Sequence, residues 1–224
     1  MGKIVIGVDS STQSTKAIAW DINGKAIAEG RCDIPLHNPS LEKFEQNVED
    51  WWRALCVSTQ ELCQKIDINE VDGLAISNQR ETLAKLDSSG KEVYPATVWM
   101  DKRSVKEVEE LNSIMGEGRI HEITGRPKDP CPCLYRVLWM KNHEKKIFDQ
   151  IDCFADVQAF LVHRLSGEFN TGWISSDPHG MFDVVNKCWS QEILEQLTID
   201  ESRLPKSFRP GTLIGKVNLS ASKE

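Results

Sequence analysis

The chain has 224 residues, 40% of them hydrophobic, and a formal net charge of −7 at pH 7. A chain of this length and apolar content can bury a full hydrophobic core, which argues against a disordered segment. The acidic balance, with no block of Lys and Arg, argues against a nucleic-acid-binding protein, and no apolar run is long enough to cross a membrane.

The first 33 residues predict a three-stranded antiparallel meander. An apolar run over residues 4–8 is followed by a polar loop and by a second strand over 16–20. Asn23-Gly24 is a strong hairpin signal, and residues 25–29 return from it as the third strand.

A helix and three further strands are expected next. Asn47 is placed to cap the helix, and Glu49 and Asp50 favour its first turn. Its helical stripe consists of Trp51, Leu55, Thr59, Leu62 and Ile66. Short strands are predicted over 73–77 and 82–86, with a third ending at Trp99.

Beyond Asp101 the pattern is mostly helical. One apolar stripe consists of Val105, Val108, Leu111 and Ile114. Pro132 suits the first position of another helix, whose stripe holds Leu134, Val137, Leu138 and Lys141. A third stripe, made of Val157, Phe160, Leu161 and Leu165, is stopped by Gly167.

The order of these elements predicts an α/β fold. Three meander strands followed by helix, strand, helix and strand is the order of the ribonuclease H-like or actin-like ATPase fold, a mixed sheet flanked by helices. A Rossmann fold would alternate strand and helix from the start. No repeat, low-complexity segment or flexible linker interrupts the chain, so residues 1–224 are expected to form one compact unit.

The cysteines point to a reducing compartment. There are seven, an odd number with irregular spacing and no Cys-x-x-Cys pair, which predicts free thiols rather than disulfides or a zinc site. The first apolar run is also too short for a signal peptide. We therefore expect a cytoplasmic protein.

The first candidate for chemistry is the loop after the first strand, from Asp9 to Lys16. Small hydroxyl residues fill this loop, an acid precedes it and a lysine follows it. Phosphate groups are bound by such hydroxyl and backbone donors with a cation, and an aspartate can hold Mg²⁺. The alternative is an ordinary polar hairpin in which Asp9 bonds its own turn.

Two more candidates follow predicted strands. Arg80 and Glu81 present donors and acceptors side by side, which suits sugar hydroxyls, although a surface salt-bridged loop is the alternative. Trp99 can stack on the C–H face of a sugar while Asp101 accepts hydroxyl protons. Burial of Trp99 in the core is the alternative there.

Taken together and in order, these blocks resemble the FGGY family of carbohydrate kinases. The resemblance covers the whole chain. Besides the Asp9 loop, it rests on Gln79-Arg80-Glu81-Thr82, Trp99-x-Asp101-x-Arg103, Leu138-Trp139-Met140-Lys141, Leu165-Ser166-Gly167-Glu168, Ser176-Asp177, Phe182-Asp183 and Trp189.

The resemblance implies a substrate, two cofactors and a role for each candidate residue. The substrate would be a small sugar or polyol, and the cofactors ATP and Mg²⁺. Asp9 would lie near Mg²⁺ and the transferred phosphate, as a catalytic and metal-binding residue. Nucleotide phosphates would be faced by Thr12, Gln13, Ser14 and Lys16. The sugar site would be lined by Arg80, Glu81, Trp99 and Asp101.

Departures from the family pattern bear on the substrate. Ser11 stands where the family often has glycine, and Cys133 and Arg136 stand where it often has a small or hydroxyl residue and a lysine. A glycerol-specific member would place an aromatic ring near Cys131. The loop after Asp9 and the Trp99-x-Asp101-x-Arg103 block look more like the xylulokinase branch, so the chain is expected to be closest to it and to act on a xylulose-like pentulose. A glycerol- or erythritol-type polyol kinase is the alternative, because the Arg80–Glu81 pair resembles those enzymes.

The family's general base has no counterpart in the sequence. In the family it is an aspartate in a glycine-rich segment of the C-terminal, nucleotide-binding domain, and no such segment occurs here. Asp156 suits a helix cap, and Asp177 and His179 suit a loop turn. We therefore expect residues 1–224 to be the N-terminal, sugar-binding domain, truncated before that partner domain and inactive by itself.

Two hypotheses that assign the chain to other functional classes stay open. One is a non-catalytic sugar-binding module, and the other is an actin-like ATPase such as a chaperone or filament protein, which needs no sugar-binding tryptophan. The sequence fixes neither the sugar nor the oligomeric state, and a homodimer is not excluded.

Overall fold

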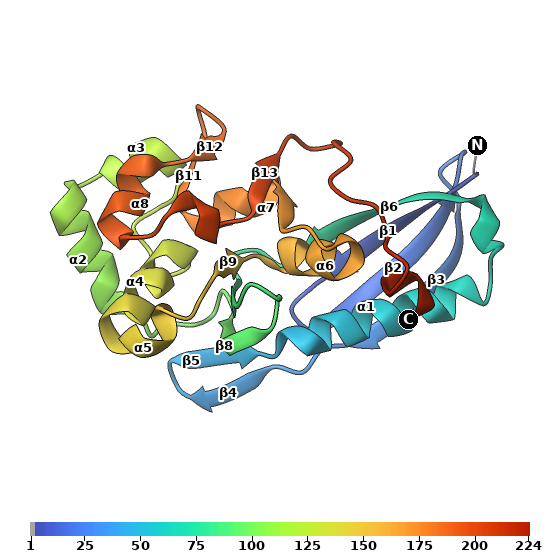
Figure 1. The fold of residues 1–224 in the computed structure, drawn as a ribbon, viewed down its shortest axis with the longest axis horizontal. Helices are drawn as coiled ribbons and strands as arrows, with labels where there is room; N and C mark the ends of the chain where they lie inside the picture. Colours follow the sequence, from blue (N-terminus) through green and yellow to red (C-terminus); the bar gives the residue numbers. More distant parts are fainter. Residues whose placement is uncertain (1–2) are drawn as a thin grey trace.

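A mixed four-stranded sheet forms one end of the molecule in the computed structural model, which describes residues 3–224 (Figure 1). In sheet order its strands are β3 (Ala26–Asp33), β2 (Ser14–Asp21), β1 (Ile4–Ser10) and β6 (Val71–Asn78). β1 pairs antiparallel with β2 and parallel with β6, and β2 pairs antiparallel with β3. The predicted meander within a mixed sheet is therefore confirmed.

Two helices, α1 (Val48–Cys63) and α6 (Val157–Ser166), cover one face of this sheet. Ile4, Ile6 and Val8 of β1 point toward them and are buried, whereas the side chains between them face outward. Gly30 permits the close approach of β3 to α1, since a Cβ there would lie 2.0 Å from the carbonyl oxygen of Ser58.

The predicted ends of α1 and α6 are present, whereas Pro132, expected as the first residue of its helix, lies just before α4 as the N-cap. Asn47 caps α1, its Oδ1 accepting a hydrogen bond from the backbone N–H of Glu49 at 2.9 Å. Asp156 caps α6 through the N–H of Ala159, also at 2.9 Å. Gly167 ends α6 in the left-handed conformation, as expected.

A second, antiparallel sheet lies in the middle of the molecule; two of its strands, β7 and β8, match the strands predicted over 82–86 and before Trp99, but β4, β5, β9 and the pairing were not predicted. In order it contains β4 (His37–Ser40), β5 (Lys43–Gln46), β8 (Glu92–Thr97), β7 (Leu83–Leu86) and β9 (Cys153–Ala155). The β4–β5 hairpin precedes α1 in the chain, and β4 is exposed throughout, so it carries no alternating apolar pattern. β7 is buried on both faces: Leu83 packs into one hydrophobic core, and Ala84 and Leu86 pack into another.

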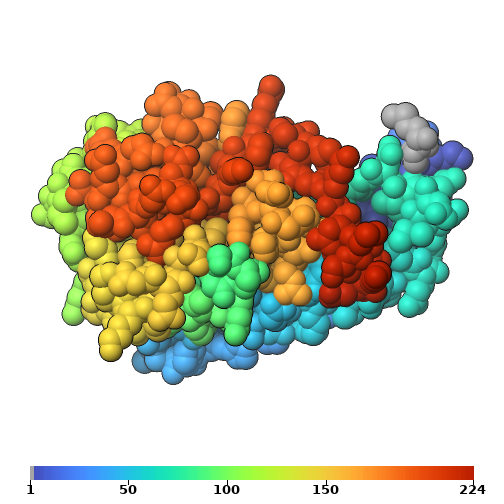
Figure 2. Space-filling view, in the orientation of Figure 1, coloured from blue at the N-terminus to red at the C-terminus, as the bar shows by residue number. Residues whose placement is uncertain are grey.

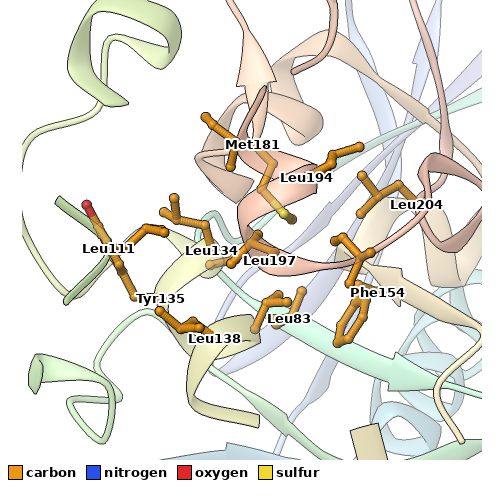
Figure 3. Packing of buried hydrophobic residues seen from close by; sticks show 14 of the residues in the cluster. Leu83, Leu111, Leu134, Tyr135, Leu138, Phe154, Met181, Leu194, Leu197 and Leu204 are labelled. Atoms are coloured by element: carbon orange, nitrogen blue, oxygen red, sulfur yellow. The ribbon is translucent and has the colours of Figure 1, made fainter. Parts of the chain in front are cut away.

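The other end of the molecule is helical (Figures 1 and 3). It contains α2 (Val105–Met115), α3 (Arg119–Thr124), α4 (Cys133–His143), α5 (Lys145–Phe148) and α8 (Gln191–Leu197). Leu111, Leu134 and Leu197 meet in its core (Figure 3). The predicted stripe of α2 is only half right: Val105 and Ile114 are 52% and 60% exposed, because the helix buries a narrower face against α4.

Short elements complete the chain. They are β10 (Asn170–Gly172), α7 (Trp173–Ser176), β11 (Phe182–Asp183), β12 (Cys188–Trp189), β13 (Lys206–Phe208), and 3₁₀ turns at Ile68–Glu70, Asp177–His179, Glu201–Arg203 and Ala221–Lys223. The last turn lies against α1 and α6 (Figure 2). The indole N–H of Trp52 donates to the carboxylate of Glu224 at 2.7 Å. None of the helices between residues 3 and 224 combines the length and apolar character needed to span a bilayer.

Candidate functional site

Two polar loops meet at one end of the first sheet. β1 and β6 run parallel, with Ser10 opposite Asn78, and the backbone N–H of Gln79 donates to the carbonyl of Ser10 at 2.9 Å. The loop after β1 carries the proposed phosphate residues, and the loop after β6 carries Arg80 and Glu81. Parallel strands therefore bring together two segments that are far apart in the sequence.

Asp9 lies on the outward face of β1 and is exposed. Its carboxylate accepts hydrogen bonds from the hydroxyl of Ser11 at 2.7 Å and from that of Ser77, on β6, at 3.1 Å. These bonds orient the carboxylate and leave it open to solvent. Mg²⁺ keeps most of its waters and takes only one or two protein carboxylates beside substrate phosphates, so a single aspartate fits it.

No group of three or more His, Cys, Asp and Glu side chains between residues 3 and 224 could hold a metal by itself. The one-carboxylate arrangement at Asp9 thus suits a metal ion that arrives with phosphate groups.

The rest of the first loop is a tight hairpin. The N–H of Ser11 donates to the carbonyl of Ser14 at 2.9 Å, Gln13 is exposed, and the hydroxyl of Thr12 accepts a bond from the indole N–H of Trp99 at 3.2 Å. Lys16 instead pairs with Glu29 across the sheet at 2.9 Å. Thr12, Gln13 and Ser14 are therefore gathered in the loop, and Lys16 lies beside it on the outward face.

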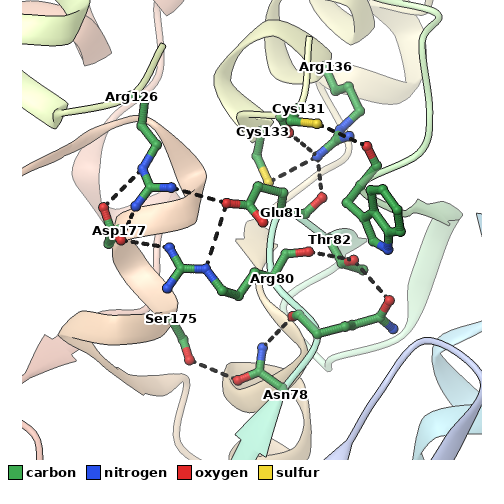
Figure 4. Close-up of polar contacts among 12 residues, drawn as sticks. Asn78, Arg80, Glu81, Thr82, Arg126, Cys131, Cys133, Arg136, Ser175 and Asp177 are labelled. Atoms are coloured by element: carbon green, nitrogen blue, oxygen red, sulfur yellow. Dashed lines mark hydrogen bonds and ion pairs between the residues drawn. The ribbon is translucent and has the colours of Figure 1, made fainter. Parts of the chain in front are cut away.

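Arg80 and Glu81 belong to a cluster of four charged side chains (Figure 4). Arg80 pairs with Asp177 at 2.8 Å and approaches Glu81 at 3.7 Å, and Arg126 joins Glu81 at 3.2 Å and also bonds Asp177. Two guanidinium groups and two carboxylates thus balance one another, with Arg80 42% exposed and the other three side chains mostly buried at 19–22%. Arg126 and the pairing role of Asp177 were missed from the sequence, since 97 residues separate Asp177 from Arg80.

Glu81 adopts a left-handed backbone conformation, with φ of 47°. This conformation costs a residue other than glycine of order 1–3 kcal/mol and persists only where its surroundings enforce it. Arg136, buried beneath the loop, donates to the carbonyl of Glu81.

Trp99 is 45% exposed and lines two hollows, so it is not a core residue. One hollow, of about 310 Å³, includes Asp9, Arg80 and Glu81. The other, of about 400 Å³, is lined by Leu41, Phe44, Trp99, Met100, Asp101, Lys102, Asp129, Pro130 and Cys131. The candidate site therefore extends from the phosphate loop to both sides of the indole ring.

Asp101 lines the second hollow but is only 1% exposed. Its carboxylate accepts from the N–H of Phe44 at 2.8 Å and from the guanidinium of Arg103 at 2.8 and 2.7 Å. Arg103 also reaches Glu45 at 2.6 Å. With both oxygens engaged, Asp101 fixes the segment after Trp99 to strand β5.

Cys131 stands near Trp99, its thiol lying 3.4 Å from the Trp99 carbonyl oxygen. Burial, together with the nearby Asp129, raises the pKa of this thiol to about 11, so it is neutral at pH 7. His179 does not pair with Asp177. It is buried, and its Nε2 lies 3.6 Å from Asp156.

Comparisons with known proteins bear on this site. The model of the FGGY family of carbohydrate kinases, N-terminal domain, matches residues 4–224. Glycerol kinase of Thermococcus kodakarensis is 30% identical over 212 residues, which cover 92% of this chain and 42% of the relative. The chain thus spans less than half the length of that relative.

Two solved structures share the fold closely. Gluconate kinase from Lactobacillus acidophilus has a TM-score of 0.93 at 27% identity and matches 98% of this chain and 44% of its own. A ligand-bound xylulose kinase from the same organism has the same TM-score and identity, with 98% and 45% covered.

Proposed function

The chain belongs to the FGGY family of carbohydrate kinases, whose N-terminal domain it carries, and we propose that its parent enzyme transfers the γ-phosphoryl group of ATP to a hydroxyl of a pentulose such as xylulose. Residues 1–224 supply the sugar site and one phosphate loop, and a nucleotide-binding domain completes the active site. The free state of all seven cysteines supports a cytoplasmic setting.

The observation that carries the proposal is that one hollow contains Asp9, Arg80, Glu81 and Trp99. Phosphoryl transfer needs the acceptor hydroxyl and the charged phosphates within contact of each other, in line. A hollow that joins a phosphate-type loop to a set of hydroxyl-binding side chains meets that need.

Asp9 is the proposed catalytic carboxylate on the phosphate side. Mg²⁺ bound with the nucleotide would supply neutralisation of phosphate charge. Asp9 would hold the hydrated ion, oriented by the hydroxyls of Ser11 and Ser77. Thr12, Gln13 and Ser14 offer hydroxyl, amide and backbone donors to the phosphates.

The sugar would lie against Trp99 with its hydroxyls toward Arg80 and Glu81. The ion pairs with Arg126 and Asp177 restrict both side chains, so less rotational entropy is lost on binding. Asp101 supports Trp99 from beneath rather than receiving the sugar, since its oxygens already have partners.

Room beside Cys131 favours a pentulose over glycerol. A thiol there leaves the second hollow open at about 400 Å³, whereas an aromatic ring would fill part of it. A substrate longer than glycerol can extend past Trp99 into this space. A glycerol- or erythritol-type polyol is the second candidate, because the Arg80–Glu81 pair suits a short polyol equally well.

A substrate panel tests the proposal. We expect the 224-residue chain to bind xylulose in calorimetric titration, and the full-length gene product to release ADP with xylulose faster than with glycerol or erythritol. Binding of sugar without ADP release by the full-length protein would indicate a sugar-binding module instead. No binding or turnover with any sugar or polyol would refute the proposal.

A further inference from the structure

Arg136, on α4, is a buried arginine without a carboxylate partner. It is 1% exposed, and none of the ion pairs formed by residues 3–224 includes it. Burying a guanidinium in this way is costly unless its N–H groups are bonded, and an apolar side chain would fill the space at lower cost. The arginine therefore calls for a reason other than packing.

Its hydrogen bonds to backbone go to three separate segments, and it also bonds the thiol of Cys133 at 3.3 Å; Figure 4 shows the bonds to Glu81, Cys131 and Cys133. One terminal nitrogen donates to the carbonyl of Val98 at 3.0 Å, and the other donates to Cys131 at 3.0 Å and to Glu81. Each segment carries a wall of the candidate site: Glu81 itself, Trp99 directly after Val98, and Cys131. One guanidinium thus connects three walls that come from distant parts of the chain.

The bond to Glu81 coincides with backbone strain. Among the described residues, Glu81 shares positive φ with only two others that are not glycine, Lys187 and Thr198. Lys187 lies in the turn between β11 and β12, and Thr198 caps α8, where left-handed residues are common. Glu81 lies in the candidate site instead, and its carbonyl points at Arg136.

We propose that Arg136 is the positioning residue of the acceptor site. Its planar guanidinium sets the spacing of the Glu81, Trp99 and Cys131 segments and holds Glu81 in the left-handed conformation that directs its carboxylate to the sugar. The proposal rests on the proposed sugar-binding function. A lysine, which the family often has here, would replace it only in part: its ammonium is a single nitrogen, whereas the two terminal nitrogens of Arg136 bond Val98 on one side and Glu81 and Cys131 on the other.

The test compares Arg136→Lys and Arg136→Met with Lys85→Met. Lys85 is a matched control because it is also fully buried, but it donates to the carbonyl of Pro95 at 2.9 Å and the hydroxyl of Thr97 at 2.8 Å, not to the site walls. Affinity for the sugar that the wild type binds is measured by calorimetry, and folding by thermal melting.

We expect both Arg136 variants to unfold cooperatively and to bind sugar at least about tenfold more weakly, the loss of one well-placed bond to a charged group. In the full-length kinase the KM for sugar should rise while the KM for ATP holds. Lys85→Met should shift the melting temperature alone.

A second pair of variants tests the strain at Glu81 without altering Arg136. Glycine adopts positive φ freely and alanine does not, so Glu81→Gly should melt about 2–4 °C above Glu81→Ala. Equal melting temperatures would show that the backbone of Glu81 is not strained and would overturn that part of the proposal.

The outcomes separate the two proposals. A wild-type chain that binds no sugar refutes the proposed function. If the wild type binds sugar and the Arg136 variants bind it equally well, the positioning role is refuted and the proposed function stands. The same holds if the Arg136 variants fail to fold while Lys85→Met folds.

Discussion

The phosphate loop and the sugar-side loop follow parallel strands of one sheet, yet they are held in different ways. The loop from Asp9 to Ser14 closes on itself, through the bond from the N–H of Ser11 to the carbonyl of Ser14. The loop from Asn78 to Thr82 has its strained residue, Glu81, fixed by Arg126 and Arg136 from other elements.

This difference indicates where each loop is vulnerable. The phosphate loop should tolerate changes elsewhere in the molecule, because its shape is local. The sugar-side loop should respond to substitutions in the helical half, since α4 and the segment before it supply its supports. The two loops are joined directly by the bond from the N–H of Gln79 to the carbonyl of Ser10, and Trp99, which follows β8, bonds Thr12 of the phosphate loop.

The largest effect is expected from Asp9→Asn in the full-length enzyme. Because the charge is assigned to the metal and the transferring phosphate, kcat should fall roughly 100-fold or more with sugar affinity nearly unchanged. Steady-state kinetics and sugar titration measure this. Asp72→Asn, an exposed aspartate at the other end of β6, is the control. A near-normal kcat would contradict the catalytic role and indicate that Asp9 only forms hydrogen bonds within its own hairpin.

Arg80→Ala and Glu81→Ala should each weaken sugar binding by about 1–3 kcal/mol, since a ligand hydroxyl loses its partner. ATP binding should hold. Stability should change by less than about 1 kcal/mol in Arg80→Ala, because Arg80 is 42% exposed, and by more in Glu81→Ala, because Glu81 and its partner Arg126 are 19% and 21% exposed. Titration and melting measure both. Arg119→Ala is a matched control: Arg119 is 43% exposed against 42% for Arg80, and its pair with Glu192 is remote from the site. Unchanged affinity in both variants would leave Trp99 as the main sugar contact.

Cys131→Tyr should shift preference from pentulose toward glycerol by about tenfold, the scale at which a filled pocket discriminates by size. The ring would occupy part of the hollow beside Trp99. Competing-substrate assays on the full-length enzyme give the ratio of kcat/KM values. Cys131→Ser, which keeps the volume, should leave the ratio as it is. An unaltered ratio in the tyrosine variant would place the substrate elsewhere.

The smallest effect is expected from Thr12→Val, which removes the hydroxyl that accepts from Trp99. The loss of one neutral hydrogen bond, about 0.5–1.5 kcal/mol, should appear in sugar affinity because the indole is less well fixed. Thr12→Ser keeps the hydroxyl and should behave as wild type. If the valine and serine variants bind sugar equally, the phosphate loop does not position Trp99 for the sugar.

Local patterns predicted much of the framework. The meander, the Asn47 and Asp156 caps and the Gly167 stop depend on neighbouring residues, and the structure has them all. Strands β7 and β8 of the central sheet were predicted, but the exposed β4–β5 hairpin and the antiparallel pairing were not, because β4 lacks alternation and sheet pairing joins distant segments.

By itself the sequence determined the fold class, the family pattern and the candidate residues. This is because strand periodicity, turn-forming residues and the order of motifs depend on residues that are close together in the chain. Only the tertiary structure decided what those residues do beside one another. In the folded chain both carboxylate oxygens of Asp101 accept hydrogen bonds, and Lys16 forms an ion pair with Glu29. Arg126 and Arg136 both contact Glu81 of the sugar-side loop. Charge pairing and carbonyl contacts act through space, so spacing along the chain does not reveal them.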